Sequence, residues 1–106
     1  MVSMERIREV AAAIGREFRP LKVILFGSFA RGTAGPDSDV DLLVVMRHEG
    51  KGHVAATRVR ARIRPGFPVD LLVRDPVEIE RRLALGDGFI REILEQGIVL
   101  YETPHG

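Results

Sequence analysis

A glycine–serine pair that ends one apolar segment, followed by two aspartates in a second, constrains this chain more than any other feature. The apolar run 21–26 stops at Gly27 and Ser28, as a buried strand does when it turns into a helix. Backbone N–H groups at such a turn suit a phosphate. Asp39 and Asp41 are two residues apart, so in a strand they share one face, with Cα atoms about 6.6 Å apart. Two such carboxylates can share a cation, and the pattern therefore points to metal-assisted phosphoryl chemistry.

A third aspartate lies in a segment that repeats the second one. Asp70 is set in Pro-Val-Asp-Leu-Leu-Val, which echoes Asp-Val-Asp-Leu-Leu-Val at residues 39–44. If the two strands are neighbours about 4.8 Å apart, Asp70 can lie beside Asp39 and Asp41. Three ionised carboxylates repel by about 4 kcal/mol per pair at 4 Å and an effective dielectric near 20, a large fraction of a small domain's stability. A divalent cation removes that penalty, and oxygen ligands favour Mg²⁺ or Mn²⁺ over zinc.

Periodicity and turn residues predict alternating helices and strands. Strands are expected at residues 21–26, from 38 or 39 to 46, 67–73 and 98–101. Helices are expected at about 3–18, at 28–31, from 75 to the glycine pair at 86 and 88, and at 89–96. The segment 55–64 is ambiguous, because its arginines alternate as in a strand while its apolar residues share a helical stripe. We favour a helix, since alanine and arginine are strong helix formers and a crossover helix returns the next strand beside the last. An α/β sheet packed by helices follows.

Composition limits the other classes of function. A chain of 106 residues is expected to form one domain, residues 1–106, because it buries only roughly 60–70% of its unfolded surface. Sixteen basic against 15 acidic residues give no strong nucleic-acid signal. The absence of cysteine excludes disulfides and thiol catalysis. No apolar stretch approaches the roughly 20 residues that span a membrane, and the N-terminus is charged, so a cytoplasmic location is expected.

The two motifs together resemble the nucleotidyltransferase motif of the DNA polymerase beta superfamily, Gly-Ser followed after about ten residues by Asp-x-Asp. The positions that match are Gly27, Ser28, Arg31, Gly32, Ser38, Asp39, Asp41 and Leu42. Within that superfamily the chain is most similar to the minimal nucleotidyltransferases, which are often partnered with a HEPN-domain protein as antitoxin and toxin. The resemblance implies a polymerase-beta-like α/β (α+β) fold with a small mixed sheet packed by helices.

The resemblance also implies roles for single residues. Asp39 and Asp41 would bind Mg²⁺, with two ions expected and Mn²⁺ as the alternative, and these would bridge the nucleotide phosphates. Asp70 would complete the second metal site and help to deprotonate the acceptor hydroxyl. Gly27 would let the backbone approach the phosphates, and Ser28 would donate its hydroxyl and N–H to them.

The expected reaction is the transfer of AMP from ATP, or of another nucleotide from its triphosphate, to a hydroxyl group of a partner protein. Larger members of the superfamily hold the acceptor on an additional domain, for which this sequence has no residues left over. A HEPN-type toxin, silenced in a hetero-oligomer, is the partner that the resemblance implies. Two alternatives stay open: a non-catalytic antitoxin that masks its partner, and a transferase acting on a small molecule such as an aminoglycoside.

Some of these residues also have a simpler structural interpretation. Ser28 could be a plain helix N-cap, Gly27 a turn glycine, and Asp70 an edge-strand acid that faces water. Arg31 could contact a phosphate or pair with a carboxylate, and we leave it outside the catalytic core.

The remaining basic and aromatic residues are expected at the surface or in a strand. The arginines of 58–64 are interpreted as a solvated helix face, with a phosphate or acidic-partner patch left open. His48, His53 and His105 lack the spacing of metal ligands and are expected at the surface. Tyr101 is expected to be a strand residue, with self-modification of its hydroxyl as the alternative.

Overall fold

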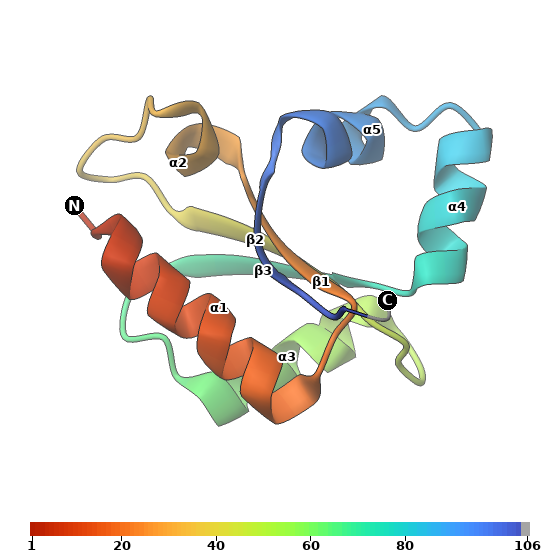
Figure 1. Cartoon of the computed structure of the whole chain (residues 1–106), viewed down its shortest axis with the longest axis horizontal. Coiled ribbons are helices and arrows are strands. Elements are labelled where there is room, and N and C mark those ends of the chain that lie inside the picture. Colours follow the sequence, from red (N-terminus) through yellow and green to blue (C-terminus); the bar gives the residue numbers. More distant parts are fainter. Residues whose placement is uncertain (105–106) are drawn as a thin grey trace.

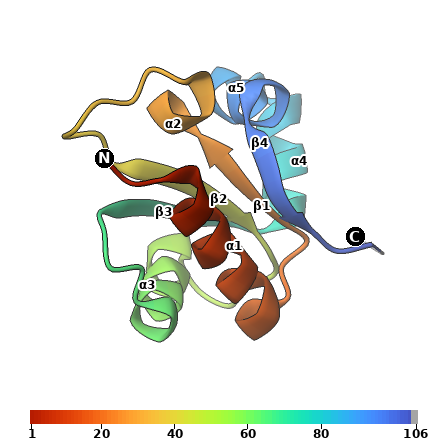
Figure 2. The ribbon, with the colours of Figure 1, turned by 60° about the vertical axis from the view of Figure 1, so that its left-hand side comes forward.

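The structure is a computed structural model, and it describes residues 1–104. In chain order its elements are α1 (Met4–Phe18), β1 (Lys22–Phe26), α2 (Gly27–Arg31), β2 (Val40–Val45), α3 (Gly52–Ile63), β3 (Val69–Arg74), α4 (Pro76–Ala84), α5 (Gly88–Gln96) and β4 (Ile98–Glu102). The sheet lies between two layers of helices (Figures 1 and 2): α1 and α3 cover one face, and α2, α4 and α5 lie on the other side. The ambiguous segment is therefore a helix, as predicted.

The four strands form one mixed sheet in the order β3-β2-β1-β4. β1 is antiparallel to both β2 and β4; α2 and the loop 32–39 connect it to β2, and α5 precedes β4. β2 and β3 are parallel, and α3 provides the crossover between them. This arrangement confirms the predicted α/β fold with a small mixed sheet.

The repeated Val-Asp-Leu-Leu-Val segments of β2 and β3 lie side by side, residue against residue. Val40 is opposite Val69, and the register continues without a shift to the end of both segments. Asp41 is therefore opposite Asp70. A crossover helix was expected to return β3 beside β2, and the register confirms it; the condition under which Asp70 comes next to Asp41 in the sheet is therefore met.

Side-chain alternation in the strands divides the core into two layers. Leu42 belongs to the larger layer, which packs against α1 and α3. Leu43 belongs to the smaller layer, where Ile79 of α4 and Ile90 and Ile93 of α5 cover the sheet. The side chains of Asp41 and Asp70 alternate along their strands with those of the larger layer. They therefore lie on the face of the sheet that holds the smaller layer.

Side chains cap the starts of α1 and α4, whereas β1, β2 and β3 begin one or two residues later than expected. The Ser3 hydroxyl accepts a hydrogen bond from the Arg6 N–H at 3.2 Å, and Asp75 caps α4 in the same way. β2 begins at Val40 because Ser38 closes the preceding loop: its hydroxyl accepts the Gly35 N–H at 2.9 Å. β3 begins at residue 69, after Pro68.

No described helix combines the length and the apolar character needed to cross a membrane.

Candidate functional site

A cavity of about 460 Å³ lies at the junction of β1 and α2, on the side of the sheet that α5 covers. Gly27, Asp41 and Asp70 line it, so the turn motif and two of the three predicted acids meet at one site. Ser28 directly follows Gly27, and Asp39 is two residues before Asp41, but neither Ser28 nor Asp39 lines the cavity. The structure thus brings together three of the five predicted residues directly.

Gly27 and Asp41 touch through a contact that only glycine permits. Gly27 has a φ of +73°, in the left-handed region, and a Cβ at this position would overlap Oδ2 of Asp41. The Asp41 carboxylate therefore lies directly against the backbone at the start of α2. Gly27 is consequently more than a plain turn glycine, because the absence of a side chain there leaves the space that the Asp41 carboxylate occupies.

Ser28 is not the N-cap of α2. That position is held by Phe26, which makes no side-chain capping bond, and Ser28 lies one residue inside the helix. Its carbonyl accepts the Thr33 N–H at 2.9 Å and helps to end α2 at Gly32. The plain capping interpretation is therefore wrong, and the role of the Ser28 hydroxyl stays a prediction.

Asp41 is a half-buried acid in a negative environment. Its pKa is raised above the ordinary value of 3.8, first by burial, then by the charges of Asp70 and Asp39, while the nearby Arg31 acts in the opposite direction. Neighbouring carboxylates that repel in this way are what a divalent cation would neutralise, and all the donors are oxygen atoms, as Mg²⁺ and Mn²⁺ prefer. In donor chemistry the residues fit such an ion.

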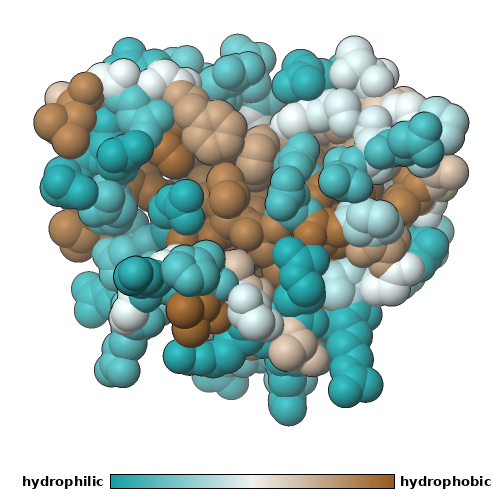
Figure 3. All heavy atoms as spheres, turned by 180° about the vertical axis from the view of Figure 1, so that it is seen from behind, coloured by the Kyte–Doolittle hydropathy of each residue, from teal (hydrophilic) through white to brown (hydrophobic). Residues whose placement is uncertain are grey.

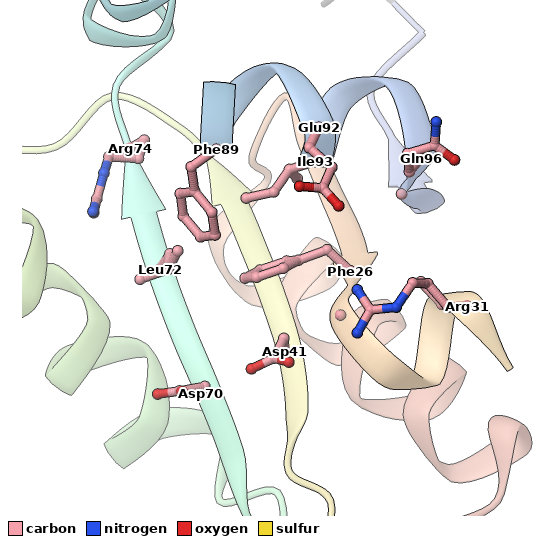
Figure 4. A pocket seen from close by; sticks show the side chains of 13 residues that line it. Phe26, Arg31, Asp41, Asp70, Leu72, Arg74, Phe89, Glu92, Ile93 and Gln96 are labelled. Atoms are coloured by element: carbon pink, nitrogen blue, oxygen red, sulfur yellow. The ribbon is translucent and has the colours of Figure 1, made fainter. Parts of the chain in front are cut away.

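The three carboxylates do not yet converge. Among residues 1–104 no three Asp, Glu, His or Cys side chains are gathered closely enough to hold a metal ion. Asp39 precedes β2 and borders a separate hollow with Pro68, and in Figure 4 the Asp70 carboxylate points away from Asp41. Both side chains are exposed, and within residues 1–104 neither takes part in a hydrogen bond or an ion pair.

The other end of the cavity is apolar, and no sequence motif pointed to it. Phe26, Leu72, Phe89 and Ile93 line this end, as Figure 4 shows. From behind, apolar side chains gather across the middle of the molecular face, framed by hydrophilic ones (Figure 3). The helical period of α5 predicted a buried stripe, but it could not show which sheet face the helix covers.

Charged and polar side chains also border the cavity, and of these the sequence had pointed to Arg31 alone. Arg31 extends its guanidinium toward the cavity from α2, while Glu92 and Gln96 reach it from α5 and Arg74 from the end of β3 (Figure 4). Glu92 and Gln96 are distant in sequence from Gly27 and the aspartates, so no local spacing could have linked them to the site. Arg31 forms no ion pair in the described residues, and its guanidinium remains available to an anion.

Two of the arginines at residues 58–64 make contacts within the fold instead of forming an unoccupied cationic surface patch. Arg60 donates a hydrogen bond to the Val69 carbonyl at 2.6 Å, which ties α3 to β3. Arg62 pairs with Glu17 of α1 at 3.3 Å. Both contacts join elements of the fold, so a single cationic surface made of the whole series is not present.

The remaining candidates have structural environments. The Tyr101 ring packs so closely on Gly15 that a Cβ there would overlap it, which favours the strand interpretation over self-modification. His53 is exposed, as expected. His48 is half-buried, and within residues 1–104 its Nδ1 has no hydrogen-bond partner. His105 lies outside the described residues.

The sequence of this chain is similar to that of known nucleotidyltransferases. The family model described as "Nucleotidyltransferase domain" matches residues 7–100. The putative protein adenylyltransferase of Methanocaldococcus jannaschii is 30% identical over 97 residues, which cover 90% of this chain and 94% of that protein.

Solved structures share the fold. A protein described as a putative minimal nucleotidyltransferase superposes with a TM-score of 0.60 at 27% identity, over 90% of each chain. A chain from a toxin–antitoxin complex crystallised with AMP-PNP superposes with a TM-score of 0.52 at 18% identity, over 98% of this chain and 77% of that one. The second likeness concerns the fold alone.

Proposed function

The chain belongs to the nucleotidyltransferase domain family, as a minimal nucleotidyltransferase, and from this premise we propose that it transfers AMP from ATP to a hydroxyl group of a partner protein. The observation that carries the proposal is the pairing of Asp41 with Asp70 across β2 and β3, next to the glycine turn of Gly27. The similarity to a putative protein adenylyltransferase supports AMP as the transferred group and protein as the acceptor.

Each residue of the site has a proposed role. Gly27 admits the nucleotide phosphates close to the backbone, and Ser28 donates to them. Asp39, Asp41 and Asp70 hold Mg²⁺, or Mn²⁺, with their carboxylate oxygens. Such an ion, when bound, neutralises charge on the phosphates and the attacking oxygen.

The proposed transfer is a displacement at the α-phosphorus of ATP. The acceptor oxygen forms a bond to that phosphorus, and the bond from the phosphorus to the oxygen bridging to the β-phosphate breaks, which releases pyrophosphate. Asp70 takes the proton of the acceptor hydroxyl. Its exposure and its place in an edge strand suit this role, because an acceptor can approach it from solvent.

A HEPN-type toxin is the partner that we propose. The fold is shared with a chain of a toxin–antitoxin complex crystallised with an ATP analogue, and this supports a pairing of the same kind. In that case the toxin would be silenced by its modification, within a hetero-oligomer.

Incubation of the chain with ATP labelled on the α-phosphate, Mg²⁺ and the protein encoded next to it tests the proposal. The neighbouring protein should gain label and the mass of AMP, and the double variant Asp39→Asn with Asp41→Asn should transfer none. Asp37→Asn is the control, because this exposed loop aspartate has no proposed role and does not line the cavity. Label transfer by the double variant would refute the mechanism. Neutralisation of the partner by that variant without transfer would favour a masking antitoxin.

A further inference from the structure

The catalytic proposal uses the acidic end of the cavity and leaves its apolar end unassigned. We propose that the Phe89 ring stacks on the nucleobase of the substrate, so that α5 is the base-binding element of this enzyme. This inference rests on the proposed function, because it places the base in the same cavity as the reacting phosphates.

Phe89 is an exposed aromatic residue at the rim of a cavity. It is 53% exposed although it is a large apolar side chain, and it lines the cavity. Within the part of the chain that the structure describes, its one aromatic neighbour is Phe26, with the ring centroids 5.8 Å apart and the ring planes at 83°. An edge-to-face contact of this kind fixes the Phe89 ring while leaving aromatic surface open to a planar ligand.

The two ends of the cavity match the two ends of a nucleoside triphosphate. Asp41 and Asp70 form one end, and Phe26, Leu72 and Phe89 form the other (Figure 4). Gly27 belongs to the acidic end, because it lies against the Asp41 carboxylate. A base presents flat faces of π-electrons to apolar walls, whereas the phosphates need cations and backbone N–H groups. A volume of about 460 Å³ is also within the usual range for small-molecule sites.

α5 holds Phe89 in a fixed position. Ile90 and Ile93 are buried against the sheet and anchor the helix, and the Asp87 carboxylate caps it through the Ile90 N–H at 3.1 Å. Glu92 and Gln96 follow Phe89 at three and seven residues, so they line the cavity from the same helical face. A stacking residue that is rigidly presented loses little conformational entropy on binding.

Calorimetric titration of the full chain in Mg²⁺ with two ligands, ATP and inorganic tripolyphosphate, separates the base from the phosphates. For Phe89→Ala we expect the dissociation constant for ATP to rise about tenfold, the scale of one lost base–aromatic stack. The constant for tripolyphosphate should not change. Phe89→Tyr, which keeps the ring, should retain the affinity for ATP.

Two further variants guard against indirect effects. Leu94→Ala removes an apolar side chain of α5 outside this cavity and should leave both affinities unchanged. Phe89→Leu keeps apolar volume without a ring, so it should lose affinity for ATP as Phe89→Ala does even if the alanine variant folds poorly. Thermal melts of every variant identify any loss of folding.

The outcomes distinguish this inference from the proposed function. Wild-type affinity for ATP in both Phe89→Ala and Phe89→Leu would overturn the stacking role and leave the transferase proposal standing. Equal losses for ATP and tripolyphosphate would overturn it as well, because they would indicate a structural role. If the wild-type chain binds neither ligand, the proposed function itself fails.

Discussion

At the scale of the residue, Gly27 is the point where backbone conformation and site chemistry depend on each other. Its positive φ and its contact with Asp41 Oδ2 both exclude a side chain. Gly27→Ala should therefore abolish nucleotide transfer, because the new Cβ displaces the Asp41 carboxylate. Left-handed backbone at a residue with a Cβ costs roughly 1–2 kcal/mol, so the free energy of unfolding should fall by about that amount. Transfer assays and urea unfolding measure the two effects.

Gly32 provides the matched control for this substitution. Its φ is +75°, almost the same as that of Gly27, but a Cβ there would meet no atom within 4 Å. Gly32→Ala should thus lose a similar amount of stability and retain transfer activity. If both variants kept activity, the close contact of Gly27 with Asp41 would have no catalytic importance.

Asp41 should destabilise the fold in its ionised form. The pKa of Asp41 in the folded state is raised above its ordinary value of 3.8, so the folded state binds more protons than the unfolded state. The free energy of unfolding therefore falls as the pH rises from the unfolded pKa through the raised folded pKa. Asp41→Asn removes this effect, so its melting temperature should exceed that of the wild type at about pH 7 and approach it at about pH 3.5. Thermal melts at the two pH values measure the difference.

Addition of Mg²⁺ gives the same prediction a second readout. An ion that binds only the folded state stabilises it, so Mg²⁺ should raise the melting temperature of the wild type. It should have little effect on Asp41→Asn, which has lost a ligand and a charge. An unchanged wild-type melting temperature in Mg²⁺, with ATP absent or present, would contradict the assignment of Asp41 as a ligand.

At the scale of the element, local sequence predicted most of what the structure contains. The helix at 52–63 followed from helix formers and from the need for a crossover, and that crossover predicted that β2 and β3 are neighbours. The starts of these strands were less predictable, because Ser38 bonds within its loop instead of extending the strand. Such side-chain bonds depend on how the loop closes, which periodicity does not report.

The contribution of α5 to the cavity could not be predicted. Its sequence indicates a helix with Ile90 and Ile93 on the buried face, but either face of the sheet would bury them equally well. Only the packed structure places Phe89 opposite Phe26, more than sixty residues away in sequence. The turn motif and the aspartates were visible because each is a short-range pattern, whereas the apolar end is assembled by tertiary contacts.

The N-cap of α5 leads to a prediction about the element that carries Phe89. The Ile90 N–H holds the pKa of Asp87 below its usual range, with Arg82 acting in the same direction. The capping bond therefore stabilises α5 above the usual carboxyl pKa, and it is lost as pH falls through the lowered value, the opposite sign to Asp41. Asp87→Ala should speed amide exchange in the first turn of α5 and weaken ATP binding.

Two controls separate capping from charge. Asp87→Asn should largely preserve slow exchange, because asparagine also accepts the capping bond. Asp75→Ala removes the corresponding cap of α4 and should cost about 1 kcal/mol of stability without affecting exchange in α5. Unaltered exchange in Asp87→Ala would show that burial of Ile90 and Ile93 alone fixes the start of the helix.

At the scale of the whole molecule, the sheet separates support from chemistry. The layer beneath α1 and α3 is larger and contains no residue of the cavity apart from Ala30, which packs at its edge. The layer beneath α4 and α5 is smaller, and it includes Phe26, Leu72 and Ile93, which form the apolar wall of the site. Stability and substrate binding should therefore respond differently to changes in the two layers.

Leu42 and Leu43 test this division, because they are adjacent residues of β2 that point into opposite layers. Both side chains are fully buried, with 0% exposure. Leu42→Ala and Leu43→Ala should each lower the free energy of unfolding by about 2–5 kcal/mol, the usual cost of a buried leucine with its cavity. Urea unfolding should show losses of similar size. Only Leu43→Ala should weaken ATP binding, because its cavity opens beneath Ile90 and Ile93 and loosens α5.

The affinity for tripolyphosphate shows whether Leu43→Ala weakens binding of the base alone or of the phosphates as well. Leu43→Ala should retain it, since Gly27 and Asp41 are held by β1 and β2 rather than by α5. Both variants must be compared below their own melting temperatures, because a domain of this size has only about 5–15 kcal/mol of stability and partial unfolding would lower every affinity together. If Leu42→Ala and Leu43→Ala weakened ATP binding equally while folded, the two layers would be coupled through the sheet, and the separation of support from chemistry would be wrong.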